Sequence, residues 1–463
     1  MVKRPPKRCA TMAIVGEYCG EVRELGRQTF NGGRVYSSRR RSLKKSGQSP
    51  KKDVCWTTRK EILMSRNQFQ IKALTAKHLE QYNALLRYAF QVTEKTLEES
   101  GWDDEDIKQS KFPVLERADV LGCFDGEDLV SQFAVYPLKM NIHSAVYPIG
   151  FVTSVATYPE YAGLGLMSQL MKRSLSEMRD KGQTLSLLYP YSIPLYRKRG
   201  WEIVSDKMSY RIRDDQLPQN LEVPGYVRRV SWENTDFKNL HTQFAQQTHG
   251  CLFRNHLAWE EYWRWDEDDT TVAIYYSAED KPLGYMVYLI KDDIMNIKEL
   301  IYLNAEAHKG LRRYISAHQS MLDEVRGDNY FSEPIAFSLE DSDIKETIRP
   351  YIMGRIVDVE GFLARYRCQP DVNGRVTLKV TDPLLEWNNG LFTLVFQDGR
   401  CTLSEKTAAW QAQLSIGTLT TLLLGYKRAS DLAVLEKLSG DGRAMDFLDR
   451  AIIYKKPYIS DYI

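Results

Sequence analysis

The sequence predicts a mixed α/β protein built from two copies of one α/β unit and a third, different α/β unit. Three observations carry this prediction. A strand, a glycine-containing turn and a helix follow one another around residue 160, and a second run with the same order of elements lies around residue 300. Around residue 375 the chain alternates between apolar and polar residues, as a half-buried strand does, and two amphipathic helices follow.

The first unit is expected to centre on a strand at Gly150–Thr157, which is rich in β-branched residues. A helix is expected at Leu166–Lys181, followed by a second apolar run at Leu185–Tyr189. The helix carries apolar residues at helical spacing: Leu166, Leu170, Met171, Leu175 and Met178. This order predicts two neighbouring strands joined by a helix that covers the sheet.

The turn between that strand and helix, Tyr158–Met167, contains Gly163 and Gly165. Glycines let a ligand approach the backbone closely, and the first N–H groups of a helix have no partner within it. Together with the helix dipole they favour a bound anion such as a pyrophosphate. A turn of this kind can also simply connect two elements, so the turn alone leaves both interpretations open.

Composition agrees with a globular enzyme. The chain has 463 residues, of which 43% are hydrophobic and 11% aromatic, and this is enough to fill three cores. No apolar run approaches the length of a membrane span. The seven cysteines have no CxxC spacing and no histidine cluster is present, so we expect no metal site, no disulfide framework and reduced thiols in a cytoplasmic protein. P-loop, GxSxG and HExxH motifs are absent, which removes the common nucleotidase and hydrolase classes.

Residues 1–63 differ from the rest of the chain in charge. They contain 16 Lys and Arg against 5 Asp and Glu, whereas the whole chain carries only +2, so the remainder is net acidic. Basic residues separated by Ser, Gly and Pro, without apolar periodicity, predict a disordered extension. A nucleic-acid-binding tail is one interpretation, and a dispensable extension is the one we favour. No apolar stretch follows the basic residues as a secretory signal would require.

The second unit, from residue 221, repeats the order of the first. Leu283–Tyr288 and Met295–Tyr302 predict paired strands, and Ala305–Val325 predicts the helix that follows. The turn between them, Asn304–Gly310, lacks the Gly-x-Gly opening and has a carboxylate, Glu306, where phosphates would lie. We therefore expect this copy to be catalytically empty.

An aromatic cluster occurs in the second unit, at Trp259, Tyr262, Trp263 and Trp265. These residues could form a wall for a substrate. An aromatic stripe at helical spacing is more often part of a core or an interface, and we favour that interpretation.

The third unit, from residue 355, begins with strands and ends with helices. Strands are expected at Gly374–Val380 and Leu391–Gln397, with turns at Asn388–Gly390 and Asp398–Gly399. Amphipathic helices are expected at 416–424 and 429–438.

The segment Ile193–Trp201, together with the glycine turn, resembles the GNAT (Gcn5-related) N-acetyltransferases. Members of that family have an Arg/Gln-x-x-Gly-x-Gly/Ala loop and, one helix and one strand later, a Tyr before a Gly-aromatic turn. Here Tyr196 follows Gly165 by 31 residues, and Gly200-Trp201 completes the second motif. Ala162 stands where Arg or Gln is usual, which removes a phosphate contact. Met167 stands where Gly or Ala is usual, and a large residue there is typical of the Eis (enhanced intracellular survival) acetyltransferases.

The third unit resembles the sterol-carrier-protein-like domain that closes Eis proteins, so the resemblance covers roughly residues 66–463. It implies tandem GNAT acetyltransferase folds followed by a sterol-carrier-protein-like α/β domain. The expected division is a basic extension at 1–63, an active GNAT domain at 64–220, a degenerate GNAT-like domain at 221–354 and the carrier-like domain at 355–463.

The resemblance implies acetyl-CoA as co-substrate and a set of residues that bind it. Backbone groups at the end of the first strand would hold the pantetheine arm and thioester, the turn would hold the pyrophosphate, and two residues after the next strand would reach back to the cofactor. In that order these residues are Val155, Ala156 and Thr157; Gly163, Leu164, Gly165, Leu166, Met167 and Ser168; Tyr191 and Ser192.

Two groups match the family's catalytic residues. Tyr196 corresponds to the general acid that protonates the departing CoA thiolate. The family's general base is the carboxylate of the last residue, which is Ile463 here, with Asp461 as a spare candidate. The tail Tyr458–Ile463 is apolar enough to be anchored to the fold.

Eis-like enzymes acetylate aminoglycosides at several amines, so a polycationic small molecule of this kind is the first expected acceptor. Lysines or polyamines are the second. A non-catalytic lipid carrier or scaffold with a vestigial acetyltransferase motif is the third, and Ala162 keeps it open. The resemblance implies a homohexamer. We expect neither nucleic acid nor a membrane as partner.

Overall fold

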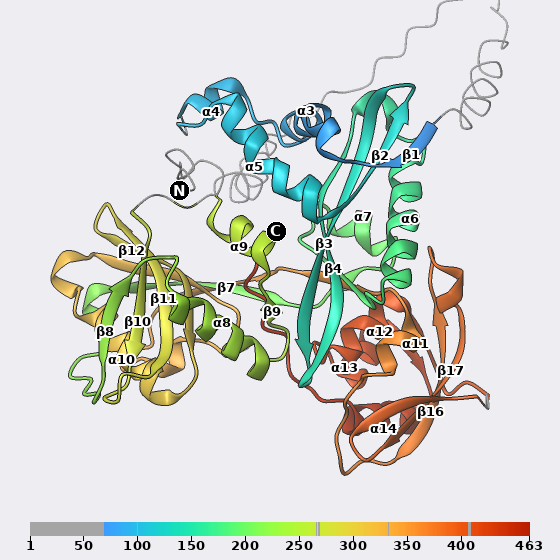
Figure 1. Cartoon of the computed structure of the whole chain (residues 1–463). Coiled ribbons are helices and arrows are strands. Elements are labelled where there is room, and N and C mark those ends of the chain that lie inside the picture. The colour runs from blue at the N-terminus through green and yellow to red at the C-terminus, as the bar shows by residue number, and fades with distance from the viewer. Residues whose placement is uncertain (1–68, 100, 265, 267–268, 332, 406–408) are drawn as a thin grey trace, which may run out of the picture.

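The computed structural model describes residues 69–463 except 100, 265, 267–268, 332 and 406–408. The basic extension expected at 1–63 lies outside the described residues. Three units surround the end of the chain, which lies between the first and the second unit (Figure 1). Short 3₁₀ turns occur at η2 (Ala76–His78), η3 (Pro159–Tyr161), η4 (Asp214–Gln216), η5 (Gln319–Met321), η6 (Ala336–Ser338) and η7 (Glu386–Asn388).

The first unit is a mixed sheet with helices on both faces. In spatial order its strands are β1 (Phe69–Ala73), β2 (Asp119–Asp125), β3 (Asp128–Ile142), β4 (Ala145–Thr157), β5 (Leu185–Leu188), β15 (Met353–Ile356) and β6 (Glu202–Ile203). The short strand β9 (Leu252–Phe253) also pairs with β3. Only β4 and β5 run parallel, and every other named pair in this sheet is antiparallel.

The helices of the first unit are α3 (Leu79–Ala89), α4 (Glu94–Glu99), α5 (Asp104–Arg117), α6 (Leu166–Asp180) and α7 (Ile193–Arg197). The expected apolar stripe of α6 is buried against β2, β3 and β4. Tyr82 and Leu85 of α3 join a different core cluster, with Ala134 and Tyr136 of β3, so α3 covers the opposite face of the sheet. Figure 1 shows α6 and α3 on either side of the strands.

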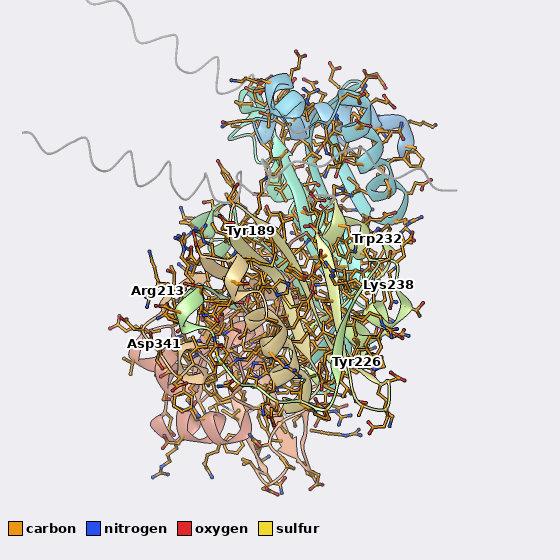
Figure 2. All side chains as sticks on the ribbon, turned by 90° about the vertical axis from the view of Figure 1, so that its left-hand side faces the viewer. Tyr189, Arg213, Tyr226, Trp232, Lys238 and Asp341 are labelled. Carbon is orange, nitrogen blue, oxygen red and sulfur yellow. The ribbon has the colours of Figure 1, made fainter. Side chains whose placement is uncertain are left out.

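The second unit repeats this plan. Its strands, in spatial order, are β14 (Lys345–Pro350), β7 (Asp206–Arg213), β13 (Glu324–Asn329), β12 (Ile294–Tyr302), β11 (Pro282–Lys291), β10 (Thr271–Tyr276) and β8 (Tyr226–Val230). Its helices are α8 (Thr235–Gln247), α9 (His256–Trp263) and α10 (Ala305–Ser316). Again one pair alone, β12 with β13, is parallel in this sheet. Figure 2 views this unit, with the exposed pair Arg213 and Asp341 at one edge.

The two sheets exchange strands. β7 follows the first unit in sequence but pairs with β13 and β14, and β15 follows the second unit in sequence but lies between β5 and β6. The boundaries expected near residues 220 and 354 therefore do not separate the two sheets at these strands. The reason is that hydrogen-bond partners of a strand are set by tertiary pairing, which the order of residues does not specify.

The third unit contains a sheet of β18 (Arg400–Ser404), β17 (Gly390–Gln397), β16 (Gly374–Thr381), β19 (Ala412–Ser415) and β20 (Leu438–Gly440). Its helices are α11 (Val359–Leu363), α12 (Ile416–Leu423), α13 (Ala429–Val434) and α14 (Gly442–Ala451). The antiparallel pairs β16–β17 and β17–β18 confirm the expected strands and the hairpin turn at Asp398-Gly399. No helix among the described residues is long and apolar enough to cross a membrane.

Two expected helices are too long and one expected turn is wrong. The helix expected at 305–325 ends at Ser316, because Val325 is buried in β13, where it pairs with β12 and β7. The helix expected at 429–438 ends at Val434, and Leu438 begins β20. Asn304–Gly310 is the start of α10, whose N-cap is Asn304. Helical spacing alone could not separate these helix ends from strands.

Candidate active site

The turn before α6 has backbone angles that require glycine. Gly163 and Gly165 have φ values of +80° and +81°, and Gly165 is the N-cap of α6. Apart from the glycine and its two chain neighbours, no atom of the described residues lies within 4 Å of a Cβ added at either position. These glycines therefore satisfy a backbone conformation and also leave open space beside the turn.

Six consecutive N–H groups, those of residues 163–168, have no hydrogen-bond acceptor within the described part of the chain. The preceding N–H, that of Ala162, donates to Pro159 O, and the next helical bond is made by Gln169. A row of free amides at the N-terminus of a 15-residue helix attracts an anion through both hydrogen bonding and the helix dipole. The free amides of residues 163–168 therefore suit an anion, as the expected pyrophosphate contacts require.

A cation lies beside this turn although Ala162 cannot supply one. Arg199 Nη2 donates to Ser168 Oγ at 3.2 Å, and Arg199 Nη1 donates to Leu195 O. Arg199 comes from the loop after α7, and the sequence pattern gave no signal that it would reach α6. Its guanidinium therefore brings a positive charge to the first turn of α6, and a guanidinium suits phosphate oxygens.

Strands β4 and β5 separate next to the turn, and the gap between their ends is called the strand opening below. Their parallel pairing covers Ile149–Val152 and Leu185–Leu188, and beyond it the two strands separate. Val155, Ala156 and Thr157 form the last part of β4, where the register with β3 shifts between Gln132 and Ala134. Among the described strands β4 has no partner on its β5 side past Val152, which leaves backbone groups available to a ligand.

At the register shift lies Ser154, whose unusual backbone conformation the sequence did not predict. Ser154 has a positive φ of 53°, uncommon for a residue with a side chain, and its Oγ accepts a hydrogen bond from the Tyr82 hydroxyl at 2.8 Å. The Tyr82 ring is fully buried. A serine in an apolar strand carries no sequence signal for a bulge, so only the pairing with β3 shows it.

Tyr191 and Ser192 lie between β5 and α7. Tyr191 is 69% exposed, and Ser192 is the N-cap residue of α7, whose carbonyl accepts from the Leu195 N–H. They flank the opening between β4 and β5 from the β5 side. The structure therefore brings all three groups of expected acetyl-CoA contacts to one edge of the sheet.

The expected general acid, Tyr196, has a buried ring and a free hydroxyl. Its side chain is 5% exposed, and no described residue forms a hydrogen bond with its oxygen. Burial raises the pKa of Tyr196 to about 12, while Arg199 acts in the opposite direction. The phenol therefore keeps its proton at neutral pH and has a donor available for a ligand.

A buried arginine holds the loop after Tyr196. Arg355 donates to the carbonyl of Arg199 and forms an ion pair with Asp382 of the third unit, and both residues of the pair are inaccessible to solvent. Its guanidinium also lies 5.1 Å from the centroid of the Trp201 ring, and this ring forms a T-shaped pair with Tyr196. The third unit thus fixes the position of the Tyr196 loop through Arg355.

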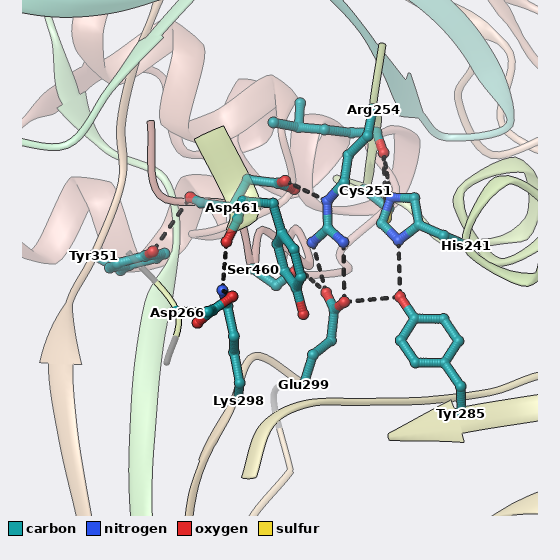
Figure 3. Close-up of polar contacts among 12 residues, drawn as sticks. His241, Cys251, Arg254, Asp266, Tyr285, Lys298, Glu299, Tyr351, Ser460 and Asp461 are labelled. Atoms are coloured by element: carbon teal, nitrogen blue, oxygen red, sulfur yellow. Dashed lines mark hydrogen bonds and ion pairs between the residues drawn. The ribbon is translucent and has the colours of Figure 1, made fainter. Parts of the chain in front are cut away.

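The end of the chain is anchored by a second buried arginine (Figure 3). Arg254 donates to Asp461 Oδ1 at 2.6 Å and to both oxygens of Glu299, at 2.7 and 3.0 Å. The Tyr351 hydroxyl donates to Asp461 O, and Ser460 Oγ donates to Glu299. Asp461 is therefore held in an ion pair, which favours a structural role over that of a base.

The same network lowers the pKa of Glu299. Burial acts to raise it, but the Arg254 charge and the hydrogen bonds from Arg254 and Tyr285 prevail and lower it to about 2. Glu299 lies on β12 of the second unit and Asp461 on the tail, so Arg254 connects the tail to the second sheet.

The last two residues reach the end of β5. Tyr462 packs edge-on against Tyr189, the residue directly after β5, with ring centroids 5.0 Å apart. Ile463 is 9% exposed and belongs to the core cluster that contains β4 and β5 residues. The contact between Tyr462 and Tyr189 therefore brings the end of the tail next to the end of β5.

The aromatic cluster of α9 is part of the core. Trp263 is buried, and Trp259 and Tyr262 pack against the cluster around Phe237 and Tyr285. Trp265 lies outside the described residues. The interpretation as core is confirmed for the described members, which also stack against the Arg254 and Lys298 cations.

Comparison with known protein families assigns all three units. An acetyltransferase (GNAT) domain family matches residues 70–204, a second one matches residues 250–356, and a sterol carrier protein domain family matches residues 359–460. N-acetyltransferase Eis from Mycobacterium tuberculosis and from Mycobacterium bovis is 23% identical over 357 residues, which covers 73% of this chain and 86% of the relative.

Solved structures show the same architecture. A protein of unknown function from Enterococcus faecalis V583, described as a probable N-acyltransferase, superposes with a TM-score of 0.78 at 28% identity and covers 85% of this chain and 100% of its own. A GCN5-related N-acetyltransferase from Anabaena variabilis gives 0.76 at 24% identity, and Eis1 from Mycobacterium abscessus gives 0.71 at 18%. Each of these two structures also covers 85% of this chain and 100% of its own chain.

The chain is therefore a GNAT N-acetyltransferase, and acetyl-CoA is the acyl donor that this fold uses. Two GNAT units followed by a sterol-carrier-protein-like unit, in an order shared with the Eis relatives, make it an Eis-type acetyltransferase. Among the described residues no group of three or more His, Cys, Asp and Glu side chains could hold a metal ion.

Substituting Gly165 by Ala tests the anion site. We expect acetyl-CoA affinity to fall by tenfold or more, because the added methyl group enters the open space and the left-handed backbone costs about 1–2 kcal/mol. The matched control is Gly182→Ala at the other end of α6, where φ is +71° and the space is equally open. Calorimetric titration with acetyl-CoA measures both; equal affinity losses in the two variants would reject the site.

Acid should weaken the anchoring of the tail. Because the folded-state pKa of Glu299 is about 2 instead of its usual 4.5, its stabilisation is complete above pH 4.5 and is lost as the pH falls towards 2. Urea unfolding between pH 5 and 3 should therefore show a smaller pH dependence in Glu299→Gln than in the wild type. The exposed Glu340→Gln serves as control, and an unchanged slope in Glu299→Gln would contradict the assignment.

Proposed function

We propose that this acetyltransferase transfers the acetyl group to an amine of a polycationic small molecule such as an aminoglycoside, with Tyr196 as general acid and the Ile463 carboxylate as general base. The observation that carries the proposal is the arrangement around β4 and β5: the free amides of residues 163–168 follow β4, the Tyr196 hydroxyl without a described partner follows β5, and Tyr462 packs on Tyr189 directly after β5. A homohexameric assembly and a cytoplasmic location remain predictions from the family resemblance.

The acceptor class is supported by what surrounds the strand opening. Tyr189, Tyr191 and Tyr462 are exposed there, and the electron-rich faces of aromatic rings attract ammonium groups. In the proposed site the terminal carboxylate adds a negative charge that attracts the same cations. The carboxylates of Asp103 and Asp106 accept hydrogen bonds from each other's backbone N–H at the start of α5, so they cap this helix.

In the proposed mechanism the amine nitrogen attacks the thioester carbonyl carbon, the new C–N bond forms and the C–S bond breaks. Val155–Thr157 offer backbone groups that hold the thioester and stabilise the developing oxyanion. The Ile463 carboxylate takes the proton lost by the amine. Tyr196 donates to the departing thiolate; its raised pKa is matched to this task because the burial that raises it also disfavours a thiolate charge in the same place.

The proposal is tested by measuring CoA release from acetyl-CoA with aminoglycosides, polyamines and lysine peptides. We expect turnover with the aminoglycosides, and a loss of about 10²–10⁴-fold in kcat for Tyr196→Phe with acetyl-CoA affinity nearly unchanged. Turnover with lysine peptides or polyamines alone would transfer the proposal to those acceptors. Wild-type turnover in Tyr196→Phe would remove Tyr196 from the mechanism.

Extending the chain by a few residues after Ile463 should lower kcat strongly, because the terminal carboxylate moves away from the strand opening. Ile463→Leu keeps the carboxylate in place and is the matched control. Acetyl-CoA affinity, measured by calorimetry, should be similar in both. Full activity in the extended protein would reject the terminal carboxylate as the base.

A further inference from the structure

The second unit contains a cavity of about 300 Å³ that its expected catalytic emptiness does not explain. This volume is at the lower end of the range for ligand pockets. The walls come from β7, β12, β13, α10 and residues 330–331 and 333–339, and they are mainly apolar. Residues that form them include Ile297, Leu300, Ile315, Val325, Phe331 and Leu339.

The cavity lies where the second unit would hold a cofactor. β12 and β13 pair in parallel over Ile294–Ile297 and Glu324–Gly327 and then separate, as β4 and β5 do in the first unit. In both units a helix connects the two parallel strands. The cavity is therefore the equivalent of the strand opening at which the pantetheine arm is expected in the first unit.

The start of α10 cannot accept a nucleotide as α6 can. The Asn304 side chain occupies the helix N-terminus by accepting from the Ala307 N–H at 2.9 Å. Glu306 adds a negative charge to the first turn and accepts from the Tyr275 hydroxyl at 2.8 Å. A capped and negatively charged helix start disfavours a pyrophosphate, so we expect the ligand of this cavity to be a molecule other than CoA.

At its polar end the cavity is lined by Arg312, which has no carboxylate partner among the described residues. Arg312 of α10 is half-buried, donates to Ser338 O at 2.6 Å and forms no ion pair with any described residue. Burial lowers its pKa, with Tyr302 as the opposing influence. His308 stacks on Tyr302 with ring centroids 4.4 Å apart, and burial lowers the pKa of His308 to about 4, so the imidazole is neutral at pH 7.

The carboxylates near the cavity do not neutralise Arg312. Asp328 is held by Lys207 at 2.9 Å and by Ser209 at 2.6 Å. Glu333 is exposed at the rim. A half-buried guanidinium without a counter-charge is unfavourable, and a bound anion would relieve that cost.

We propose that this cavity binds a small monocarboxylate with an apolar body, such as a medium-chain fatty carboxylate. The carboxylate lies against Arg312, and the chain lies among Ile297, Leu300 and Val325. A single negative charge matches Arg312, the one lysine or arginine among the described residues that line the cavity, and the apolar walls exclude more polar anions. The second unit then serves as a binding unit for a ligand that is not CoA.

The test is calorimetric titration of the full-length protein with octanoate and with 1-octanol, its neutral counterpart. We expect octanoate to bind more tightly than 1-octanol. Arg312→Gln should weaken octanoate binding by tenfold or more and leave 1-octanol binding unchanged. Arg313→Gln removes a neighbouring exposed arginine of α10 that does not line the cavity, and it should bind octanoate like the wild type.

A second variant separates this site from the carrier-like third unit. Leu300→Phe fills the cavity and should weaken both ligands, while acetyl transfer, measured by CoA release, reports whether each variant is folded. The proposal is overturned if octanoate does not bind, or if its affinity is the same in the wild type, Arg312→Gln and Leu300→Phe. In that last case octanoate binds elsewhere.

Discussion

The parallel pair at the centre of the first sheet holds together for only four residues on each strand, and the active site depends on this. Where β4 and β5 separate, backbone groups lose strand partners and become available to a ligand. The glycine turn follows β4 and the Tyr196 loop follows β5, so both motifs necessarily begin at the same opening. A longer parallel pair would satisfy these groups within the sheet and close the site.

Two buried arginines connect this opening to the rest of the chain. Arg355 holds the loop after Tyr196 to Asp382 in the third unit, and Arg254 holds Asp461 of the tail to Glu299 in the second. Each is a charge that solvent does not reach, so removing one partner leaves an uncompensated ion and costs about 3–5 kcal/mol. The second and third units therefore contribute to the candidate site of the first by positioning the loop after Tyr196 and the end of the chain.

The strand exchange makes the two GNAT units a single structural body. β15 completes the first sheet beside β5, and β7 occupies the corresponding place beside β13 in the second. The first sheet therefore contains a strand that follows the second unit in sequence, and the second sheet contains a strand that directly follows the first unit. The units nevertheless differ at their strand openings, since glycines leave the first helix N-terminus free whereas Asn304 and Glu306 occupy the second. The same architecture thus provides an anion site in one unit and an apolar cavity ending at Arg312 in the other.

Features that depend on neighbouring residues can be predicted from the sequence. These are the glycine turn, the buried stripe of α6 and the Tyr196–Trp201 loop, because backbone angles and helical periodicity are local properties. The strand exchange, the bulge at Ser154, the position of Arg199 and the anchoring of Asp461 by Arg254 became visible in the folded chain alone. The same holds for the end of α10 at Ser316, where helical spacing continued in the sequence. Each of these depends on partners far along the chain, and such pairings are fixed by packing and burial, which local patterns do not encode.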